Sequence, residues 1–388
     1  MNIGIFTEAY FPQISGVATL VDVLDKELTK LGHNVYIFTN YYPDTIDENK
    51  NVFRLPSIPF VFDKACRVGS FYSHKIMKEI KKIKLDVIHT HTEFSMGLFG
   101  RIVAKKLKIP IVHTYHTMYG DWIDSSIGKN PVGFVASNII SDISKKHCNF
   151  CYKIIAPSGK IKEVLEGYGI KKPIEIISNG VNLEPFIKAN EEYDLEKIKK
   201  LKEELNININ DKILLNLGRQ SKEKSVDVIV RSLPELIKIR KDVKFVVIGD
   251  GPGKQDLEKL VKDLNLEKYV IFLGKRPRQD IEKFYKIADL FITASLFEVQ
   301  PVTVIEAMAA KLPVMVKKDK AFEGVIEKDV TGFVFEKDEE LPLILNQILD
   351  NKLLLNTISN NAFEKIGNFS SINFTKNVER VYFEAIKK

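Results

Sequence analysis

The feature that most constrains the fold of this chain is a regular alternation of short apolar runs with helical patterns, repeated in two series. The first series opens with the apolar run Ile3–Phe6 and closes with Ile174–Ile177, and the second runs from Ile213–Leu217 to Pro313–Val316. Apolar runs of strand length that alternate with helical patterns are typical of β-α-β units, which build a parallel sheet with helices on both faces. The alternation therefore predicts an α/β protein with two doubly wound sheets.

The chain length and a charged segment predict two domains. The chain has 388 residues, which suits two domains of ~100–200 residues each. A Lys/Glu-rich stretch at 183–211 separates the two series. We therefore expect one Rossmann-like domain over residues 1–185 and a second over 186–370, with a helix at about 371–388 packing back on the first. Ligands of such sheets bind at the carboxyl ends of the strands, so we expect the site in a cleft that the two domains face.

The composition is typical of a soluble globular protein, with 45% hydrophobic and 28% charged residues. No apolar run reaches the ~18–20 residues that span a bilayer, and the start, MNIGIFTEAYFP, has the pattern of a strand rather than of a signal peptide. We therefore expect a cytosolic protein. Three cysteines, Cys66, Cys148 and Cys151, make no disulfide framework, and we interpret the single C-x-x-C as a reduced pair on a helix.

The charge of the chain is unevenly distributed. The net charge is +7. Residues 1–188 hold 24 Lys/Arg against 18 Asp/Glu, whereas the remainder holds 34 against 33. A basic first half beside a neutral second half indicates that the first half meets an anionic surface, either nucleic acid or an anionic membrane.

Two loops at predicted strand ends carry groups suited to phosphate. The loop after the first strand contains no G-x-G-x-x-G, so the dinucleotide fingerprint is absent. Gly16 nevertheless lies at a predicted helix N-terminus, where backbone N–H groups can hold a phosphate, although an ordinary turn glycine is an equal alternative. In the second domain, Arg219 and Lys224 flank a strand end. Two cations there can neutralise a diphosphate, whereas the alternative is a solvated surface loop.

The strongest pattern in the chain is a pair of carboxylates, Glu298 and Glu306, separated by seven residues. Glu298 lies in the loop after the predicted strand Asp289–Thr293, and Glu306 lies about two turns into the helix that follows. Carboxylates accept hydrogen bonds from hydroxyl groups, so both suit a polyhydroxylated ligand. Upstream, the turn Gly249-Asp250-Gly251-Pro252 follows another strand, and its glycines also fit plain turn chemistry.

Taken in order, these motifs resemble the retaining GT-B glycosyltransferases that carry an E-x7-E motif, over nearly the whole chain. Within that family the chain is most similar to the bacterial 1,2-diacylglycerol 3-glycosyltransferases, which make monoglycosyldiacylglycerols. The segments that carry this closer resemblance are Phe6-Thr7-Glu8-Ala9-Tyr10-Phe11-Pro12, Ser15-Gly16-Val17, His113-Thr114-Tyr115-His116-Thr117-Met118-Tyr119 and Tyr168-Gly169-Ile170-Lys171-Lys172-Pro173-Ile174.

The resemblance implies a role for each donor-site residue. Gly16 would approach the diphosphate of the donor through its backbone, and Arg219 and Lys224 would bind that diphosphate. Glu298 would hold hydroxyls of the transferred sugar, and Glu306 those of the ribose. The resemblance also implies a UDP-hexose donor, glucose or galactose, a diacylglycerol acceptor and no tightly bound cofactor.

The same resemblance assigns His116 to the reaction centre, near the sugar and the acceptor, although a plain buried histidine is the alternative. Three positions depart from the family pattern. Pro301 and Lys311 stand where glycine is frequent, and Gly120 stands where an acidic residue is common. Pro301 changes the backbone donors near the sugar, so the departure concerns the identity of the sugar more than the type of reaction.

No D-x-D motif is present in the chain, so no metal-bridged diphosphate and no obligatory metal are expected. The charge of the leaving UDP would instead be offset by Arg219, Lys224 and a helix N-terminus. The family implies retention at the anomeric carbon. It is usually pictured as attack on the same face as the leaving phosphate, which helps to deprotonate the acceptor, so no enzymic nucleophile is nominated.

A basic amphipathic helix predicted at 64–84 suggests how the first domain meets a membrane. Phe71, Tyr72, Ile76, Ile80 and Ile83 can form its apolar face. Lysines around that face would add ~1 kcal/mol each near an anionic surface. The alternative is a helix packed on the sheet with a solvated lysine face. With the lipid acceptor that the resemblance implies, we expect peripheral, monotopic binding at the cytoplasmic face of the membrane. The polar candidates are Lys75, Lys78, Lys81, Lys82, Lys84, Lys105, Lys106 and Lys108.

Four other functions remain as alternatives. A GT-B transferase with a soluble or polyprenyl-linked acceptor is the best of them, and dependence on diacylglycerol would exclude it. A two-domain dehydrogenase is disfavoured because the dinucleotide fingerprint is missing. A two-lobed sugar-binding protein would normally be exported. Nucleic acid is not expected as a partner because no recognised nucleic-acid motif occurs.

Overall fold

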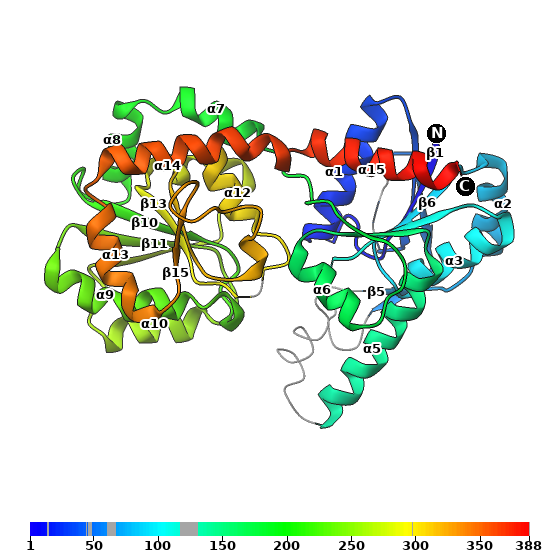
Figure 1. Cartoon of the computed structure of the whole chain (residues 1–388), viewed down its shortest axis with the longest axis horizontal. Helices are drawn as coiled ribbons and strands as arrows, with labels where there is room; N and C mark the ends of the chain where they lie inside the picture. Colours follow the sequence, from blue (N-terminus) through cyan, green and yellow to red (C-terminus); the bar gives the residue numbers. More distant parts are fainter. Residues whose placement is uncertain are drawn as a thin grey trace. The chain divides into compact units, whose positions relative to one another are not determined.

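The computed structural model describes residues 1–13, 15–43, 45, 49–59, 67–116, 131–296 and 298–387, apart from the side chains of 131–137. The chain forms two compact units (Figure 1). The first unit comprises Met1–Gly180 together with Phe369–Lys388, and the second comprises Val181–Asn368. Each unit is built on its own parallel sheet.

The first unit contains a seven-stranded parallel sheet with the order β3-β2-β1-β6-β7-β8-β9. The chain runs outward from β1 through β2 to β3 and then returns to the other side of β1 with β6. The strand order therefore reverses between β1 and β6, which is where ligands bind in open α/β sheets. The strands are β1 (Asn2–Phe6), β2 (Asn34–Asn40), β3 (Val52–Leu55), β6 (Val87–Thr90), β7 (Ile111–Thr114), β8 (Lys153–Ala156) and β9 (Ile174–Ile176).

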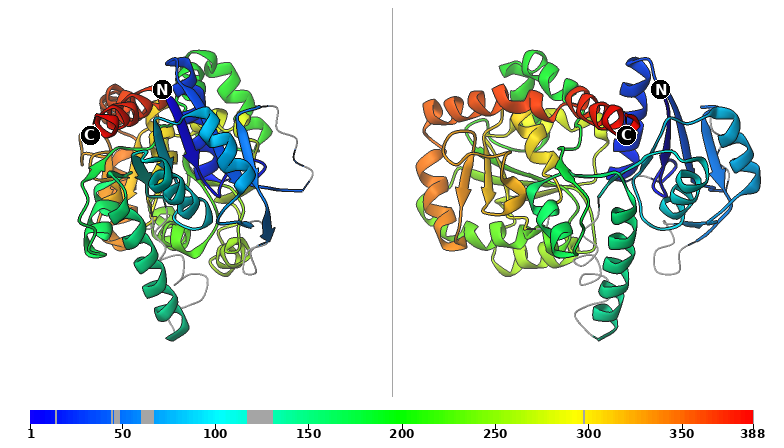
Figure 2. Two further views of the ribbon diagram at one scale, coloured as in Figure 1. Left: turned by 90° about the vertical axis from the view of Figure 1, so that its right-hand side faces the viewer. Right: turned by 45° about the vertical axis from the view of Figure 1, so that its right-hand side comes forward.

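Helices cover the sheet of the first unit, and the last of them comes from the far end of the chain. That helix, α15 (Ser371–Ile386), contacts α1 (Gly16–Lys30) and contributes Phe374, Val378 and Tyr382 to the same buried core (Figure 1). Figure 2 shows a long helix, α5, extending away from the sheet of this unit. The other helices are α2 (His74–Ile83), α3 (Ser95–Leu107), α5 (Pro131–Phe150) and α6 (Gly159–Gly167).

The expected helix at 64–84 is wrong in extent and in orientation. Residues 67–69 form strand β5 (Arg67–Gly69), which pairs antiparallel with β4 (Ser57–Pro59), and α2 begins only at His74. Ser73 caps α2 by accepting a hydrogen bond from the backbone N–H of Ile76. Ile76, Met77 and Ile80 are buried within the first unit. The apolar face of α2 therefore packs on its own domain, which was the alternative reading of this helix.

The second unit repeats the architecture with a six-stranded parallel sheet of order β12-β11-β10-β13-β14-β15, so its strand order reverses between β10 and β13. The strands are β10 (Lys212–Leu217), β11 (Val243–Ile248), β12 (Val270–Gly274), β13 (Leu290–Thr293), β14 (Val314–Lys317) and β15 (Phe333–Phe335). The helices are α7 (Glu184–Glu192), α8 (Leu195–Glu204), α9 (Val226–Ile239), α10 (Lys254–Asp263), α11 (Glu282–Ile287), α12 (Val302–Ala309), α13 (Leu341–Ile348) and α14 (Lys352–Lys365).

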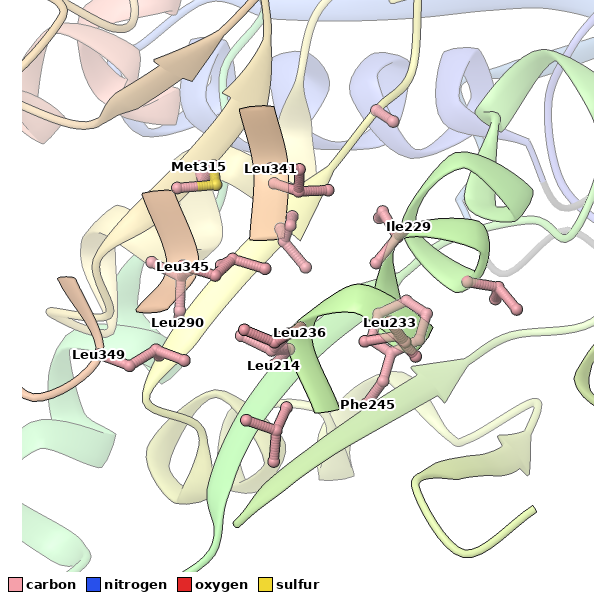
Figure 3. Close-up of a cluster of buried hydrophobic side chains, with 14 of the residues drawn as sticks. Leu214, Ile229, Leu233, Leu236, Phe245, Leu290, Met315, Leu341, Leu345 and Leu349 are labelled. Atoms are coloured by element: carbon pink, nitrogen blue, oxygen red, sulfur yellow. The ribbon is translucent and has the colours of Figure 1, made fainter. Parts of the chain in front are cut away.

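The charged stretch expected as a connector is largely helical, since it forms α7 and α8. The core of the second unit lies between the sheet and the helices α9 and α13 (Figure 3). Leu214 and Phe245 from the sheet meet Leu233 of α9 and Leu345 of α13. Burial of such side chains contributes ~1.5–3 kcal/mol each to the stability of this unit.

Among the described residues, no helix combines the length and the apolar character that crossing a bilayer requires.

Candidate functional site

Close backbone packing shapes the loop at the end of β10. A side chain at Gly249 would lie 1.9 Å from the carbonyl oxygen of Gly218, and one at Gly251 would lie 2.3 Å from that of Gln220. Gln220 N–H donates to the Asp250 carbonyl at 3.0 Å. The glycines of the 249–252 turn are therefore required because two loops pass close together. This packing fixes the course of the loop that carries Arg219.

The two predicted diphosphate-binding cations have different surroundings. Arg219 is exposed and has no hydrogen-bond or ion-pair partner among the described residues. Lys224, in contrast, donates from Nζ to Oε1 of Glu298 at 2.7 Å, and both side chains are partly buried. The adjacency of β10 and β13 brings these two residues together, although 74 positions separate them in the chain.

Glu306 is fully buried and already has two partners that were not predicted. It is the fifth residue of α12, hence just over one turn into the helix instead of the expected two. Arg278 forms an ion pair with Oε1, and the hydroxyl of Tyr285 donates to Oε2 at 2.9 Å. Burial raises the pKa of Tyr285 well above its usual value, so this hydroxyl stays a hydrogen-bond donor.

Arg278 covers this buried carboxylate from the solvent side. Its side chain is 61% exposed, whereas that of Glu306 is inaccessible. The guanidinium lies 5.3 Å from the ring centre of Phe186, within cation–π range. A ribose that hydrogen-bonds to Glu306 must therefore approach beside Arg278 or displace it.

Gly16 is the first residue of α1, next to the N-cap Ser15, which accepts from the Ala18 N–H at 3.1 Å. A side chain placed on Gly16 would meet no described atom within 4 Å. The described structure thus contains no packing reason for glycine at this position. The first turn of α1 leaves backbone N–H groups that suit an anion.

His116 lies just beyond the end of β7 and pairs with a second histidine that was not predicted. His91 follows the adjacent strand β6, and its Nδ1 lies 2.9 Å from Nε2 of His116. The two rings are nearly parallel, with centres 5.1 Å apart. Burial lowers the pKa of His116 to about 3 and that of His91 well below its usual range. Both imidazoles are therefore neutral at neutral pH.

Three further histidines extend this buried group. Nε2 and Nδ1 of His89 pair with Thr114 Oγ1 at 2.7 Å and Tyr382 Oη at 2.6 Å. His113 and His147 share Thr90 Oγ1, at 2.9 and 3.0 Å. Parallel pairing of β6 with β7 aligns Thr90 with His113, whereas His147 comes from α5. The repeated His-Thr motifs at the ends of the two strands were the sequence signal for the members of this group other than His147.

Glu8 supplies a carboxyl group at the end of β1, beside the reversal of strand order. Its Oε1 accepts from the backbone N–H of Met96 at 2.6 Å and from Ser95 Oγ at 2.9 Å. Burial raises the pKa of Glu8 to about 7, and the nearby charge of Glu93 acts in the same direction. Glu8 belonged to a recognised motif, but its role was not predicted.

The predicted membrane residues form part of the outer surface of the first unit. Phe71 is 54% exposed. Tyr72 is only partly exposed, and its ring contacts Phe99 and lies 4.6 Å from Lys106 Nζ. Lysines that point away from the core are Lys75, Lys78, Lys81 and Lys82.

Cys148 and Cys151 are free and buried. They were expected on a helix, but only Cys148 lies on α5, because that helix ends at Phe150. Cys66, Gly120 and the segment Thr117-Met118-Tyr119 lie outside the described residues.

Comparison with known proteins covers both units. Residues 14–185 match the family described as Glycosyltransferase Family 4, and residues 197–365 match Glycosyl transferases group 1. The chain is 36% identical to an alpha-monoglucosyldiacylglycerol synthase of Acholeplasma laidlawii, over 100% of this chain and 98% of that protein. It is 34% identical to the synthase of the same name from Streptococcus pneumoniae, over 100% and 86%.

Solved structures agree in fold. HepE of Anabaena, crystallised with UDP, superposes with a TM-score of 0.77 at 19% identity, over 99% of this chain and 100% of that one. A glycosyltransferase from Rickettsia africae gives 0.75 at 22% identity, over 100% and 98%. The expected α/β architecture of two Rossmann-like domains, the GT-B fold, is therefore confirmed. The chain belongs to the glycosyltransferase family that unites a Family 4 domain with a group 1 domain, and within it to the relatives of the alpha-monoglucosyldiacylglycerol synthases.

Proposed function

We propose that this enzyme transfers a hexose, glucose or galactose, from a UDP-sugar to the 3-hydroxyl of 1,2-diacylglycerol with retention at the anomeric carbon. The product is a monoglycosyldiacylglycerol. The observation that carries the proposal is the full-length identity of 34–36% to two alpha-monoglucosyldiacylglycerol synthases, which includes both units.

The second unit supplies the donor site in this proposal. Arg219 has no partner among the described residues, so its guanidinium is available to the diphosphate. Lys224 and Glu298 form an ion pair at 2.7 Å, which holds the carboxylate where it can accept from sugar hydroxyls. Glu306 receives the ribose hydroxyls. The backbone at Gly16 adds an anion-binding helix N-terminus, and no metal takes part.

The reaction breaks the bond between the anomeric carbon and the UDP oxygen, and it forms a bond between that carbon and the acceptor oxygen. The proton of the acceptor hydroxyl passes to the leaving phosphate. Arg219 and Lys224 offset the charge that develops on UDP. His116 lines the reaction centre as a neutral hydrogen-bonding group, because burial lowers its pKa to about 3.

The first unit supplies the membrane contact. The apolar face of α2 is occupied by the core, so we assign attachment to Phe71, Tyr72 and the outward lysines, which suit an anionic surface. The protein then binds peripherally at the cytoplasmic face of the membrane, and nucleic acid is not a partner. The lysines are Lys75, Lys78, Lys81 and Lys82.

A direct assay tests the proposal. The purified chain receives UDP-glucose or UDP-galactose with anionic vesicles that contain or lack diacylglycerol, and the lipid product is identified by mass spectrometry. We expect a monohexosyl lipid only when diacylglycerol is present, and loss of that product in Glu298→Gln. EDTA is expected to leave the rate unchanged. Absence of glycolipid with both donors would refute the proposal.

A second acceptor has its own support. The chain is 30% identical, over 87% of its length, to an Escherichia coli enzyme named UDP-Gal:alpha-D-GlcNAc-diphosphoundecaprenol alpha-1,3-galactosyltransferase. A polyprenyl-diphosphate-linked sugar is therefore the acceptor to test in parallel. Transfer to that acceptor, with none to diacylglycerol, would favour a role in polysaccharide assembly.

A further inference from the structure

The contact between His91 and His116 joins a buried side chain to a partly exposed one. His91 is 2% exposed, whereas His116 is only partly buried. His91 Nδ1 and His116 Nε2 are 2.9 Å apart. On its other side the ring of His91 packs on His89, with ring centres 4.1 Å apart. Both ring nitrogens of His89 are hydrogen-bonded, to Thr114 and to Tyr382. A fixed ring therefore supports His91 from behind.

The charge state of these histidines restricts the form of the hydrogen bond between His91 and His116. His89, His91 and His116 each have a pKa below the usual histidine value, first because of burial and then because neighbouring histidines disfavour a second positive charge. His113 is the other titratable group that acts on both members of the pair. The pair is thus neutral, and its hydrogen bond needs one N–H donor and one bare nitrogen acceptor.

The second nitrogen of His91 decides which ring donates. His91 Nε2 is buried and has no hydrogen-bond partner among the described residues. If His91 accepted at Nδ1, its own proton would reside on Nε2 as a buried N–H without an acceptor, which is rare and costly in folded proteins. If Nδ1 carries the proton and donates to His116, only a bare nitrogen remains unpaired. His116 Nε2 then accepts, and the proton of His116 resides on Nδ1.

We propose that His91 is a positioning residue that holds His116 in the tautomer with its proton on Nδ1. His116 then offers an N–H donor, with a fixed ring orientation, to the sugar or acceptor oxygen at the reaction centre. This role in catalysis rests on the function proposed above, whereas the tautomer itself does not.

Two substitutions separate positioning from simple packing. His91→Asn keeps a donor near the place of Nδ1, and His91→Phe keeps ring volume but removes the donor. We expect His91→Phe to lower kcat roughly 10- to 100-fold, by analogy with the effect of removing the hydrogen-bond partner that orients a metal-bound histidine. The KM for the UDP-sugar should change less than about twofold, and His91→Asn should recover most of the rate.

The tautomer is measured without turnover. In protein labelled with 15N-histidine, the ring nitrogen shifts identify which atom carries the proton, and His116→Gln assigns the signals. We expect His116 to be protonated at Nδ1 in the wild type and in His91→Asn, and to populate both tautomers in His91→Phe.

His147→Gln is the matched control. His147 is equally buried and also has one unpaired ring nitrogen, but its contacts are with Thr90 and His113. The His147→Gln variant should have lower thermal stability, while its His116 signals and its kcat stay near those of the wild type. The inference is overturned if His116 keeps its shifts in His91→Phe, or if that variant keeps wild-type kcat. If the wild-type protein makes no glycolipid, only the proposed function is refuted, because the 15N shifts test the tautomer independently.

Discussion

The two units share one architecture but present opposite chemistry at the carboxyl ends of their strands. All seven histidines belong to the first unit, and five of them gather at or near the ends of β6 and β7 as a largely buried group. Burial lowers the pKa of four of these five, namely His89, His91, His116 and His147. The second unit has no histidine, and its site consists of ions, namely Arg219 and the pairs Lys224–Glu298 and Arg278–Glu306.

The unit whose site is ionic is nearly neutral overall, whereas the unit with the histidine group has a large net charge. The first unit holds 27 Lys/Arg against 19 Asp/Glu, a net charge of +8, whereas the second holds 31 against 32, a net charge of −1. The positive surplus of the first unit thus lies outside its histidine group. In the second unit, Lys224–Glu298 and Arg278–Glu306 are paired, whereas Arg219 is not paired with any described residue. The contrast teaches that a doubly wound sheet only provides the place for a site, and that the side chains at its strand ends decide whether that place is ionic or uncharged.

The largest expected effect is that mild acid unfolds the first unit before the second. Burial lowers the pKa values of His89, His91 and His147 well below 6.5 and that of His116 to about 3. Below pH 6.5 the unfolded chain binds protons that the folded chain does not. The free energy of unfolding therefore falls by up to about 1.4 kcal/mol per pH unit for each group. This contribution is complete above pH 6.5 and is lost as the pH falls toward the folded-state values.

Hydrogen exchange followed by mass spectrometry between pH 7 and 5, corrected for the intrinsic rate, measures this difference. Peptides of β6 and β7 should lose protection while those of β10 and β13 keep it. Glu8 acts in the opposite direction, because its raised pKa of about 7 adds stability as the pH falls from 7 toward 4.5. Because Glu8 is one group and the four histidines act in the other direction, we expect the net effect of acid on this unit to be destabilising. Equal loss of protection in both units would contradict the comparison.

The next largest effect is expected at Arg219, the exposed arginine after β10 that is unpaired among the described residues. Arg219→Ala should lower kcat/KM about 100- to 1000-fold, because a group that stabilises developing charge is removed. The melting temperature should hardly change, since surface substitutions usually alter stability by less than about 0.5 kcal/mol. Lys222→Ala, at an exposed lysine of the same loop, is the control and should be near wild type. Equal losses in both variants would indicate a diffuse charge effect.

A smaller effect separates the two carboxylates. Glu306→Gln should destabilise the second unit by about 2 kcal/mol, less than a fully buried pair because Arg278 is largely exposed. Glu298→Gln should cost less than about 1 kcal/mol. Calorimetry with UDP should show weaker binding for Glu306→Gln only, because UDP contains the ribose but no transferred sugar. The reverse pattern would exchange the two assigned roles.

The smallest effect concerns the surface charge of the first unit. Lys78→Gln and Lys81→Gln should each weaken binding to anionic vesicles by about 1 kcal/mol, or roughly fivefold. Lys259→Gln and Lys262→Gln on α10 remove the same charge from the second unit and serve as the matched pair. Vesicle flotation at fixed salt compares the two double variants. If both bind equally weakly, attachment follows net charge and not this surface.

Local sequence sufficed for many of the elements, although not for the 64–84 segment or the connector, and it located the two carboxylates of the candidate site. The run Ile213–Leu217 predicted β10 within one residue, and Gly159–Gly167 predicted α6, because helical and strand periodicities depend on residues close in the chain. The E-x7-E spacing likewise located Glu298 and Glu306 on one strand-loop-helix unit.

The orientation of α2 and the partners of the site residues followed only from the tertiary structure. A basic amphipathic helix has the same sequence pattern whether its apolar face meets a bilayer or a core, and here the core holds Ile76 and Ile80. The pairings of His91 with His116 and of Glu306 with Arg278 join residues 25 and 28 positions apart. The sequence by itself determined which side chains stand at strand ends. Which of them are in contact was decided by strand order and register, because contacts between residues far apart in the chain produce no local sequence pattern.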